Sequence, residues 1–254
     1  MSPEEYKKLA KVEDDMWYFR ALHAHVGRSL RIALPRGRPA RILDAGCGTG
    51  GLVRRLGDGG RAWTWEAVDL SPEACRLASD RTGLKVREAS VTALPFESAS
   101  LDAIVSVDVL CQIEDPAPAV IEFFRVLRPG GILVLNLPAC PSLWSYHDTC
   151  VGNLRRYRAR ELAPMLIPSG FRGVRCTHWN SLALPALWLK RRLFAPRQPV
   201  SDVAVTSLPV SLAMRGILFL ETLWLELDFR FIAGASLLVV ARKPLVEDHL
   251  PDSA

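Results

Sequence analysis

The sequence predicts an α/β protein built on a doubly wound, mostly parallel sheet, with an added apolar helical cap. Strand-like apolar segments alternate with helical segments through the first 140 residues. A glycine-rich turn at residues 46–51 follows the first of these strands and opens a helix. Leu101–Val107 is nearly all apolar, as strands buried between two layers of helices are. These three observations favour a parallel sheet covered on both faces.

The elements follow from periodicity and from helix-start signals. The first 39 residues are mostly helical (4–34) and form a lid. Ser71 is expected to cap a helix over 73–82, with Pro72 at its first position. A further helix is expected at 118–127. Seven strands are expected at 41–43, 63–68, 84–88, 101–107, 132–137, 173–179 and 234–243.

A chain of 254 residues fits one domain. We divide it into the lid at 1–39, the core sheet at 40–180 and 234–243, and a helical cap inserted at 181–233. The cap is rich in Leu, Trp and Phe and too long for an ordinary connection. It either packs on the core as a plain helical layer or roofs a hydrophobic substrate. Its stretch 187–194 could also rest on an anionic membrane surface or a lipid carrier.

Composition narrows the classes of protein. Hydrophobic residues make up 49% and charged residues 23%, enough to bury a core. The net charge of +5 comes largely from scattered arginines, so no nucleic-acid footprint is predicted. Six cysteines without C-x-x-C or metal-ligand spacing indicate free thiols and a cytoplasmic protein. The most apolar stretch, 203–227, contains three charged residues and is not expected to span a bilayer simply.

The glycine turn and the acid before it indicate the cofactor. Gly46, Gly48 and Gly51 satisfy the G-x-G-x-x-G pattern of dinucleotide sites. Asp44 argues against a dinucleotide, because a carboxylate there would repel a pyrophosphate. It would attract an ammonium or sulfonium centre, and S-adenosylmethionine (SAM) carries both. Asp69 closes the next strand, where an acid can accept the ribose hydroxyls of either cofactor.

Five runs in order, spanning roughly residues 40–140, resemble class I SAM-dependent methyltransferases: LDAGCGTGG, VDLSPEA, SVTALPF, LDAIVSVDVL and RVLRPGGILVL. The resemblance implies a Rossmann-like seven-stranded sheet. It also implies that Asp44, Gly46 and Gly48 hold the methionine portion, that Asp69 holds the ribose, and that Ser90 and Val91 border the adenine. Ser90 stands where an aspartate is common. Further cofactor-binding residues are predicted at Tyr18, Arg20, Cys47, Leu70 and Val107.

The flanks resemble one bacterial branch of this family. Its features are the aromatic run before Arg20, a His-Asp pair, and a later Arg-Arg-Tyr segment. His147 is the first candidate for base or orienting residue, with Asp148 as its orienter. Tyr157 and Glu161 complete the catalytic set, although Glu161 also suits a helix start. No metal centre is predicted; His147 and Asp148 are the residues that could ligate one.

The predicted substrate contacts combine cations with tryptophans. Arg155 and Arg156 could bind a phosphate or carboxylate, or could lie on a solvated helix. Arg20 could meet the cofactor carboxylate or a substrate anion. The tryptophans expected at the substrate are Trp17, Trp179, Trp188 and Trp224.

The sequence therefore predicts SAM-dependent methyl transfer to a small acceptor, apolar or lipid/isoprenoid-like and bearing an anionic group, in specialised-metabolite or lipid/glycan biosynthesis. Whether oxygen, nitrogen or carbon is methylated stays open, as does the oligomeric state. The alternatives are an RNA or protein methyltransferase, a non-catalytic SAM-binding protein, and a NAD-dependent oxidoreductase. A contiguous basic face would favour the first of these, and titration with SAM against NAD would separate the last.

Overall fold

The structure, a computed structural model, describes the chain except for residues 58–61, 194–200, 204–206, 228 and 246–254. The described residues form a seven-stranded sheet in the order β3-β2-β1-β4-β5-β7-β6. Among the described strands, β7 is the one that runs opposite to all the others, so it is antiparallel to both of its neighbours, β5 and β6. The strands are β1 Ala40–Ala45, β2 Trp63–Asp69, β3 Arg87–Glu88, β4 Leu101–Val107, β5 Leu127–Pro138, β6 Arg172–Trp179 and β7 Ser236–Arg242. The predicted fold class, a doubly wound and mostly parallel sheet, is confirmed.

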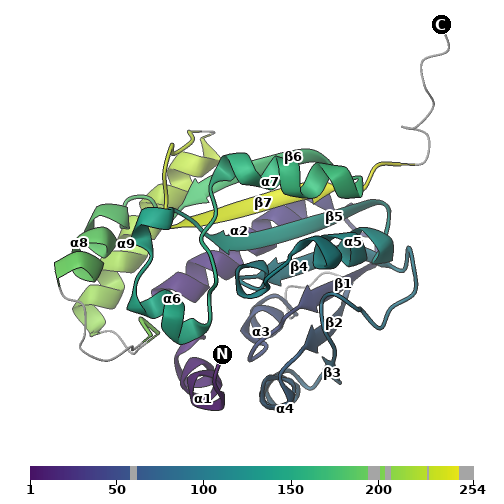
Figure 1. The fold of residues 1–254 in the computed structure, drawn as a ribbon, viewed down its shortest axis with the longest axis horizontal. Helices are drawn as coiled ribbons and strands as arrows, with labels where there is room; N and C mark the ends of the chain where they lie inside the picture. The colour runs from purple at the N-terminus through teal and green to yellow at the C-terminus, as the bar shows by residue number, and fades with distance from the viewer. Residues whose placement is uncertain (58–61, 194–200, 204–206, 228, 246–254) are drawn as a thin grey trace, which may run out of the picture.

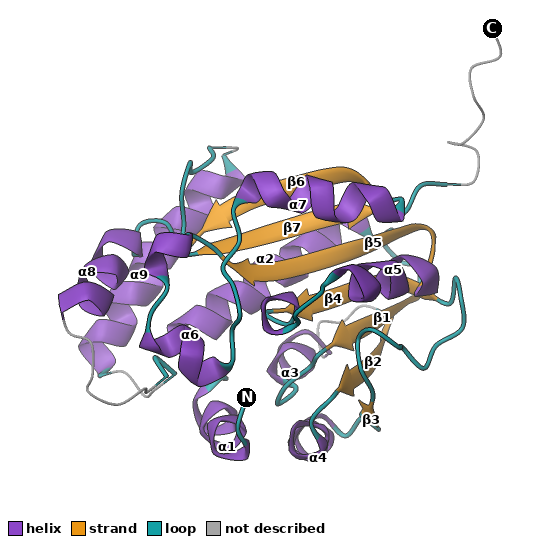
Figure 2. Ribbon diagram, viewed as in Figure 1, coloured by secondary structure: helices purple, strands orange, loops and turns teal. Residues whose placement is uncertain are grey.

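Helices cover both faces of this sheet (Figures 1 and 2). Helices α5 and α7 pack on one face, and α2 and α3 pack on the other. The α-helices are α1 Pro3–Val12, α2 Trp17–Ala33, α3 Gly51–Gly57, α4 Pro72–Thr82, α5 Ala117–Val126, α6 Tyr146–Val151, α7 Ala159–Leu166, α8 Leu184–Leu193 and α9 Leu208–Glu226. Short 3-10 helices lie at η1 Leu110–Gln112, η2 Pro141–Leu143 and η3 Ile167–Ser169.

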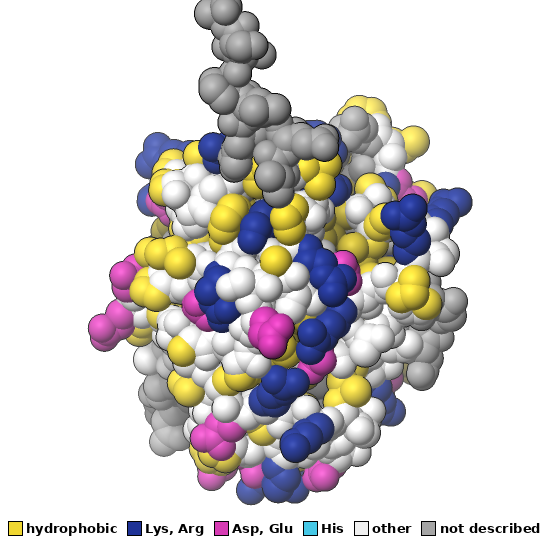
Figure 3. Space-filling model, turned by 90° about the vertical axis from the view of Figure 1, so that its right-hand side faces the viewer, with side chains coloured by type: hydrophobic (Ala, Val, Ile, Leu, Met, Phe, Trp, Pro, Cys, Tyr) yellow, Lys and Arg dark blue, Asp and Glu magenta, His cyan; other side chains and the backbone are white. Residues whose placement is uncertain are grey.

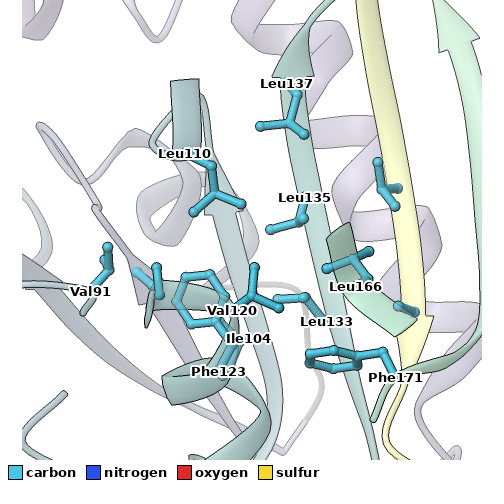
Figure 4. Close-up of a cluster of buried hydrophobic side chains, with 14 of the residues drawn as sticks. Val91, Ile104, Leu110, Val120, Phe123, Leu133, Leu135, Leu137, Leu166 and Phe171 are labelled. Atoms are coloured by element: carbon cyan, nitrogen blue, oxygen red, sulfur yellow. The ribbon is translucent and has the colours of Figure 1, made fainter. Parts of the chain in front are cut away.

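The larger hydrophobic core lies between the sheet and the α5/α7 layer. Ile104, Leu133 and Leu135 project from the central strands and are fully buried. Phe123 of α5 and Leu166 of α7 close over them, as Figure 4 shows. Because β4 and β5 are buried on both faces, their sequences read as nearly continuous apolar runs. This packing fixes the carboxyl ends of the central strands, where ligands bind in open α/β sheets.

Two predicted elements need correction. The helix expected over 4–34 is two helices, because the chain leaves helical geometry between Val12 and Trp17. Glu13 in this break is buried and accepts a hydrogen bond from Arg81 at 2.8 Å, which anchors the break to α4. The third strand is only Arg87–Glu88 instead of 84–88, because only these two residues pair with β2. The cap of α4 is confirmed: Ser71 Oγ accepts the Ala74 amide.

The cap consists of α8 and α9, which lie beyond the sheet at the left of Figure 1. Glu221 of α9 is buried, and its Oε2 accepts the backbone amides of Ser181 and Leu182 at 2.8 and 3.0 Å. Leu218, one turn earlier, is buried as well. These contacts fasten one side of α9 to the end of β6. Part of the stretch 187–194, namely residue 194, lies outside the described residues.

Candidate active site

A cavity of about 1030 Å³ opens at the carboxyl ends of β1, β2, β4 and β5. Helices α1, α2, α6, α8 and α9 contribute to its walls. In Figure 1, α1, α6, α8 and α9 lie on that side of the sheet, whereas α2 packs on a face of the sheet and reaches the cavity with its N-terminal part. The volume is at the upper end of the range for small-molecule sites, about 300–1,000 Å³. The glycine turn therefore faces a space large enough for more than one small ligand.

The glycine turn brings bare backbone to this cavity. Gly46 has φ +83°, and a Cβ there would lie 2.3 Å from Val109 Cγ2. Gly48 also has positive φ, but a Cβ there would meet nothing within 4 Å and would enter the cavity. The first glycine is thus required by packing of the turn against the end of β4, and the second keeps the cavity wall open to a ligand.

Asp44 is the buried acid beneath this turn. It is 2% exposed, lines the cavity, and its Oδ2 has no hydrogen-bond partner among the described residues. Burial raises the pKa of Asp44 well above its ordinary value, and the nearby Glu13 and Asp69 raise it further. A buried carboxylate without a partner is unfavourable unless a cation or donor meets it. A ligand with an ammonium or sulfonium centre fits this position.

Asp69 closes β2 and connects it to the glycine turn. Its Oδ2 accepts the Gly48 amide at 2.8 Å, and its Oδ1 accepts the Ser71 amide at 2.9 Å. These two bonds hold the carboxylate at the cavity wall, and each oxygen keeps a free lone pair for a ligand hydroxyl. Burial raises the pKa of Asp69 despite both bonds. Asp69 is therefore oriented to accept the two hydroxyls of a ribose.

A polar network joins the carboxyl ends of β4 and β5. Asp108, just after β4, has φ +54°, a backbone conformation that L residues rarely adopt. Its Oδ1 accepts from Asn136 Nδ2 at 2.9 Å, and its Oδ2 accepts from the Tyr18 hydroxyl at 3.3 Å. Trp179 Nε1 donates to Asn136 Oδ1 at 2.9 Å, and its ring stacks on Tyr18. Burial raises the pKa of Asp108 to about 6, although Asn136 and Tyr18 both lower it.

The opposite end of the cavity is lined by basic side chains. Arg156 is buried; its Nε lies 2.9 Å from Asp148 Oδ1 and its Nη1 donates to the Ala139 carbonyl. Arg191 of α8 pairs with Asp202 at 2.9 Å. Lys190 also pairs with Asp202, at 2.8 Å. Three cations thus gather in this part of the cavity, each paired with Asp148 or Asp202.

His147 lies in this basic end as a neutral imidazole. Burial and then the Arg191 charge lower the pKa of His147 to about 4. Its Nδ1 accepts the Asp202 backbone amide at 3.0 Å, so the proton of the neutral ring is on Nε2. In this state His147 presents a hydrogen-bond donor, and its basic nitrogen is already occupied. The geometry suits an orienting residue better than a general base.

The structure brings most predicted cofactor residues together. Among the predicted cofactor-binding residues, Arg20 alone does not line the cavity, and its side chain is exposed. Trp17 and Arg156 are the predicted substrate residues in its wall. The cofactor residues in the wall are Tyr18, Asp44, Gly46, Cys47, Gly48, Asp69, Leu70, Ser90, Val91 and Val107.

Other predicted site residues are placed elsewhere. Tyr157 is buried in the core and donates to the Leu110 carbonyl. Glu161 caps α7 by accepting the Arg158 amide at 2.9 Å. Neither Tyr157 nor Glu161 lines the cavity, nor do Asp148, Arg155, Trp179, Trp188 and Trp224. Of these, Asp148 pairs with Arg156, which lines the cavity. Trp179 donates a hydrogen bond to Asn136, which in turn binds Asp108 of the cavity.

Sequence reasoning did not select Asp108, Glu13, Arg191 and Asp202, all of which line the cavity. Asp108 had a usable signal, since it directly follows the strand whose carboxyl end faces the ligand. Glu13 reaches the glycine turn from the lid, 36 residues before Thr49, whose hydroxyl it binds. Arg191 and Asp202 come from the cap, whose position relative to the sheet no local pattern specifies.

A family model described as a methyltransferase domain matches residues 43–135. The matched segment runs from the second half of β1 into β5 and contains the glycine turn, Asp44, Asp69 and Asp108. Residues 43–135 of this chain are therefore similar to a methyltransferase domain. The chain is also similar to a malonyl-[acyl-carrier protein] O-methyltransferase of Enterobacter lignolyticus. The two are 37% identical over 116 residues, which cover 45% of each chain.

Another relative is a ubiquinone biosynthesis O-methyltransferase of Methylocella silvestris, 31% identical over 161 residues, which cover 52% of this chain and 62% of that one. The chain thus spans about half the length of the curated relatives that it matches. Among solved structures, phosphoethanolamine N-methyltransferase 2 of Haemonchus contortus, in complex with SAM, has a TM-score of 0.58 at 17% identity. That alignment covers 87% of this chain and 52% of the other, and shows that the fold is shared.

Proposed function

We propose that this protein transfers a methyl group from SAM to a small apolar or lipid/isoprenoid-like acceptor that carries an anionic group. The observation that carries the proposal is the Asp44 carboxylate, which lines the cavity and whose Oδ2 is buried without a hydrogen-bond partner among the described residues. A sulfonium or ammonium supplies the missing charge, and a pyrophosphate would add repulsion. When bound, SAM supplies an electrophilic methyl group.

The cavity is electrostatically polarised along its length. Glu13, Asp44 and Asp69 make one end acidic, and Arg156, Lys190 and Arg191 make the other end basic. We place the cofactor at the acidic end and the anionic group of the acceptor at the basic end. This arrangement would align the two reactants. The described residues contain no cluster of three or more His, Cys, Asp or Glu suited to a metal.

Asp108 is our candidate for the general base. A carboxylate with a pKa of about 6 is ionised at neutral pH, yet still basic enough to take a proton from an acceptor hydroxyl. Asn136 and Tyr18 hold both of its oxygens, so its orientation is fixed before the acceptor binds. His147 donates from Nε2 and orients the anionic group. Trp17 and Phe19 contribute apolar wall and help to exclude water.

The apolar character of the acceptor is supported by the walls and by the relatives. Leu9, Leu187, Val210 and Met214 line the cavity. Relatives of this chain include a ubiquinone biosynthesis O-methyltransferase and a demethylmenaquinone methyltransferase, and we carry the quinone class of acceptor over to this proposal. We further place the protein in the cytoplasm, where the six free cysteines would stay reduced, and treat residues 1–254 as one domain with the cap closing the site.

Incubation with methyl-labelled SAM and fractionated cell extract tests this proposal. We expect label in the organic-soluble fraction, in a product whose mass spectrum shows one added methyl group. Label confined to RNA or protein would contradict the acceptor class. Binding of SAM without labelling of any fraction would contradict catalysis.

A further inference from the structure

The outer face of α9 is a continuous apolar surface. Leu212, Phe219, Leu220 and Leu227 are 56–68% exposed and recur along one side of the helix. Trp224 on the same side is 54% exposed. A helix that is apolar on all sides is normally covered by protein or lipid, and a contiguous exposed apolar patch marks an interaction site.

The inner face of α9 is fixed to the protein by polar contacts. Glu221 accepts the amides of Ser181 and Leu182, and Arg215 donates to the Asp15 carbonyl at 2.8 Å. By length and composition alone, Leu208–Glu226 is the one described helix that could cross a membrane. Crossing would require breaking these contacts and moving Glu221 and Arg215 into hydrocarbon. The helix is therefore held with one side outward, the geometry of a helix that lies in a membrane interface.

Helix α8 adds interfacial chemistry to this surface. Trp188, Leu189 and Leu193 are 44–65% exposed. Lys190 and Arg192 are exposed between them, and the Arg192 guanidinium lies 5.7 Å from the centre of the Trp188 ring. The residues Leu184–Leu193 contain no acidic side chain. Tryptophan beside lysine and arginine is typical of the boundary between anionic headgroups and acyl chains.

The same two helices form the wall of the active-site cavity. Leu187 of α8 and Val210 and Met214 of α9 line it from the inside. The outward apolar surface and the acceptor end of the cavity are thus opposite sides of one thin helical layer. An acceptor dissolved in a bilayer against this layer would have a short apolar route into the cavity.

We infer that α8 and α9 form a docking surface for an anionic lipid bilayer. Phe219, Leu220 and Trp224 enter the acyl boundary, and Arg192 contacts the headgroups. The inference deepens the proposed function, on which its role in acceptor delivery rests. Bilayer binding itself is measured without methyl transfer, so the two can fail separately.

Flotation of the full chain with phosphatidylcholine vesicles, with and without phosphatidylglycerol, tests the inference. We expect binding to the anionic vesicles and at least tenfold weaker binding to the neutral ones, with the difference decreasing at high salt. Leu220→Glu and Arg192→Glu should each reduce binding about tenfold. The matched control is Ile121→Glu on α5, since Ile121 is as exposed as Leu220, at 56%. It should bind as the unmodified chain does.

Thermal unfolding of each variant, together with calorimetry with SAM, separates the outcomes. Unchanged SAM affinity in Leu220→Glu shows that the fold is retained. Equal binding of the Leu220→Glu and Ile121→Glu variants, or no binding to anionic vesicles, would overturn the inference. So would a dimer of the unmodified chain that Leu220→Glu dissociates, because a second copy would then be the occupant. Vesicle binding without SAM binding would refute the proposed function and leave the docking surface standing.

Discussion

Asn136 on β5 donates a hydrogen bond across 2.9 Å to the carboxylate of Asp108, which follows β4. The bond joins the ends of two neighbouring strands and fixes a strained residue, since Asp108 has φ +54°. Trp179 holds Asn136 from behind. A strained residue that lies at a cavity and is stabilised by a buried network is typical of functional positions.

Replacing Asp108 with Asn should lower kcat about 100-fold and leave SAM affinity within a few-fold, because proton acceptance is lost and the shape is kept. In the unmodified protein, the rate should fall as pH decreases through about 6, where Asp108 becomes protonated. Rates of methyl transfer from pH 5 to 8 measure both effects. Asp102→Asn, at the opposite end of β4, serves as the control, and an equal loss of rate there would refute the assignment.

His25 should make folding stability depend on acid pH. It is buried against Trp179, and burial followed by the Arg28 charge lowers its pKa from 6.5 to about 4. Because the unfolded chain takes up this proton first, stability decreases as pH falls from 6.5 to about 4, by about 1–3 kcal/mol. In the His25→Phe variant, this part of the decrease in folding stability at acid pH should be absent. Urea unfolding at pH 5 and 7.5 measures it, and an unchanged pH dependence in the variant would contradict the assignment.

The glycines of the turn should respond differently to alanine. Gly46→Ala forces Val109 away from a Cβ at 2.3 Å and strains a residue with φ +83°, so we expect a loss of about 2–4 kcal/mol of stability. Gly48→Ala has only the backbone strain, about 1 kcal/mol, but places a methyl group in the cavity. It should therefore weaken SAM binding more than it destabilises the fold. Equal stability losses in the two variants would contradict this distinction.

The parts predicted from sequence are those specified by local patterns. The strands, the capped start of α4 and the acids after β1 and β2 follow from periodicity and turn chemistry. The division between α1 and α2 was missed because it depends on Glu13 reaching Thr49 and Arg81. Trp179 was expected at the substrate, yet it is fully buried, because the antiparallel β7 places the end of β6 behind Asn136. Contacts between distant segments set these positions.

The residues at the basic end of the cavity also could not be placed from local sequence patterns. Arg155 and Arg156 are adjacent in sequence, but Arg155 is half-buried and donates to the Glu114 carbonyl, whereas Arg156 is buried at the cavity. The cluster 190–192 was expected in the helical cap, where it could rest on a membrane surface or a lipid carrier, and Arg191 within it pairs with Asp202. At the amino ends of the strands, Figure 3 shows Lys and Arg interspersed with Asp and Glu. There Arg41 and Arg87 both pair with Glu66, which does not favour a nucleic-acid surface.

Calorimetric titration with SAM and with NAD, in the unmodified protein and in Asp44→Asn, tests the central claim most directly. A bound cation should lower the raised pKa of Asp44, so SAM binding near that pKa should release a proton, visible as a dependence of the heat on the buffer. We predict that SAM binds, that NAD does not compete, and that Asp44→Asn weakens SAM binding about 100-fold. Tight binding of NAD, or equal SAM affinity in the Asp44→Asn variant, would contradict the account.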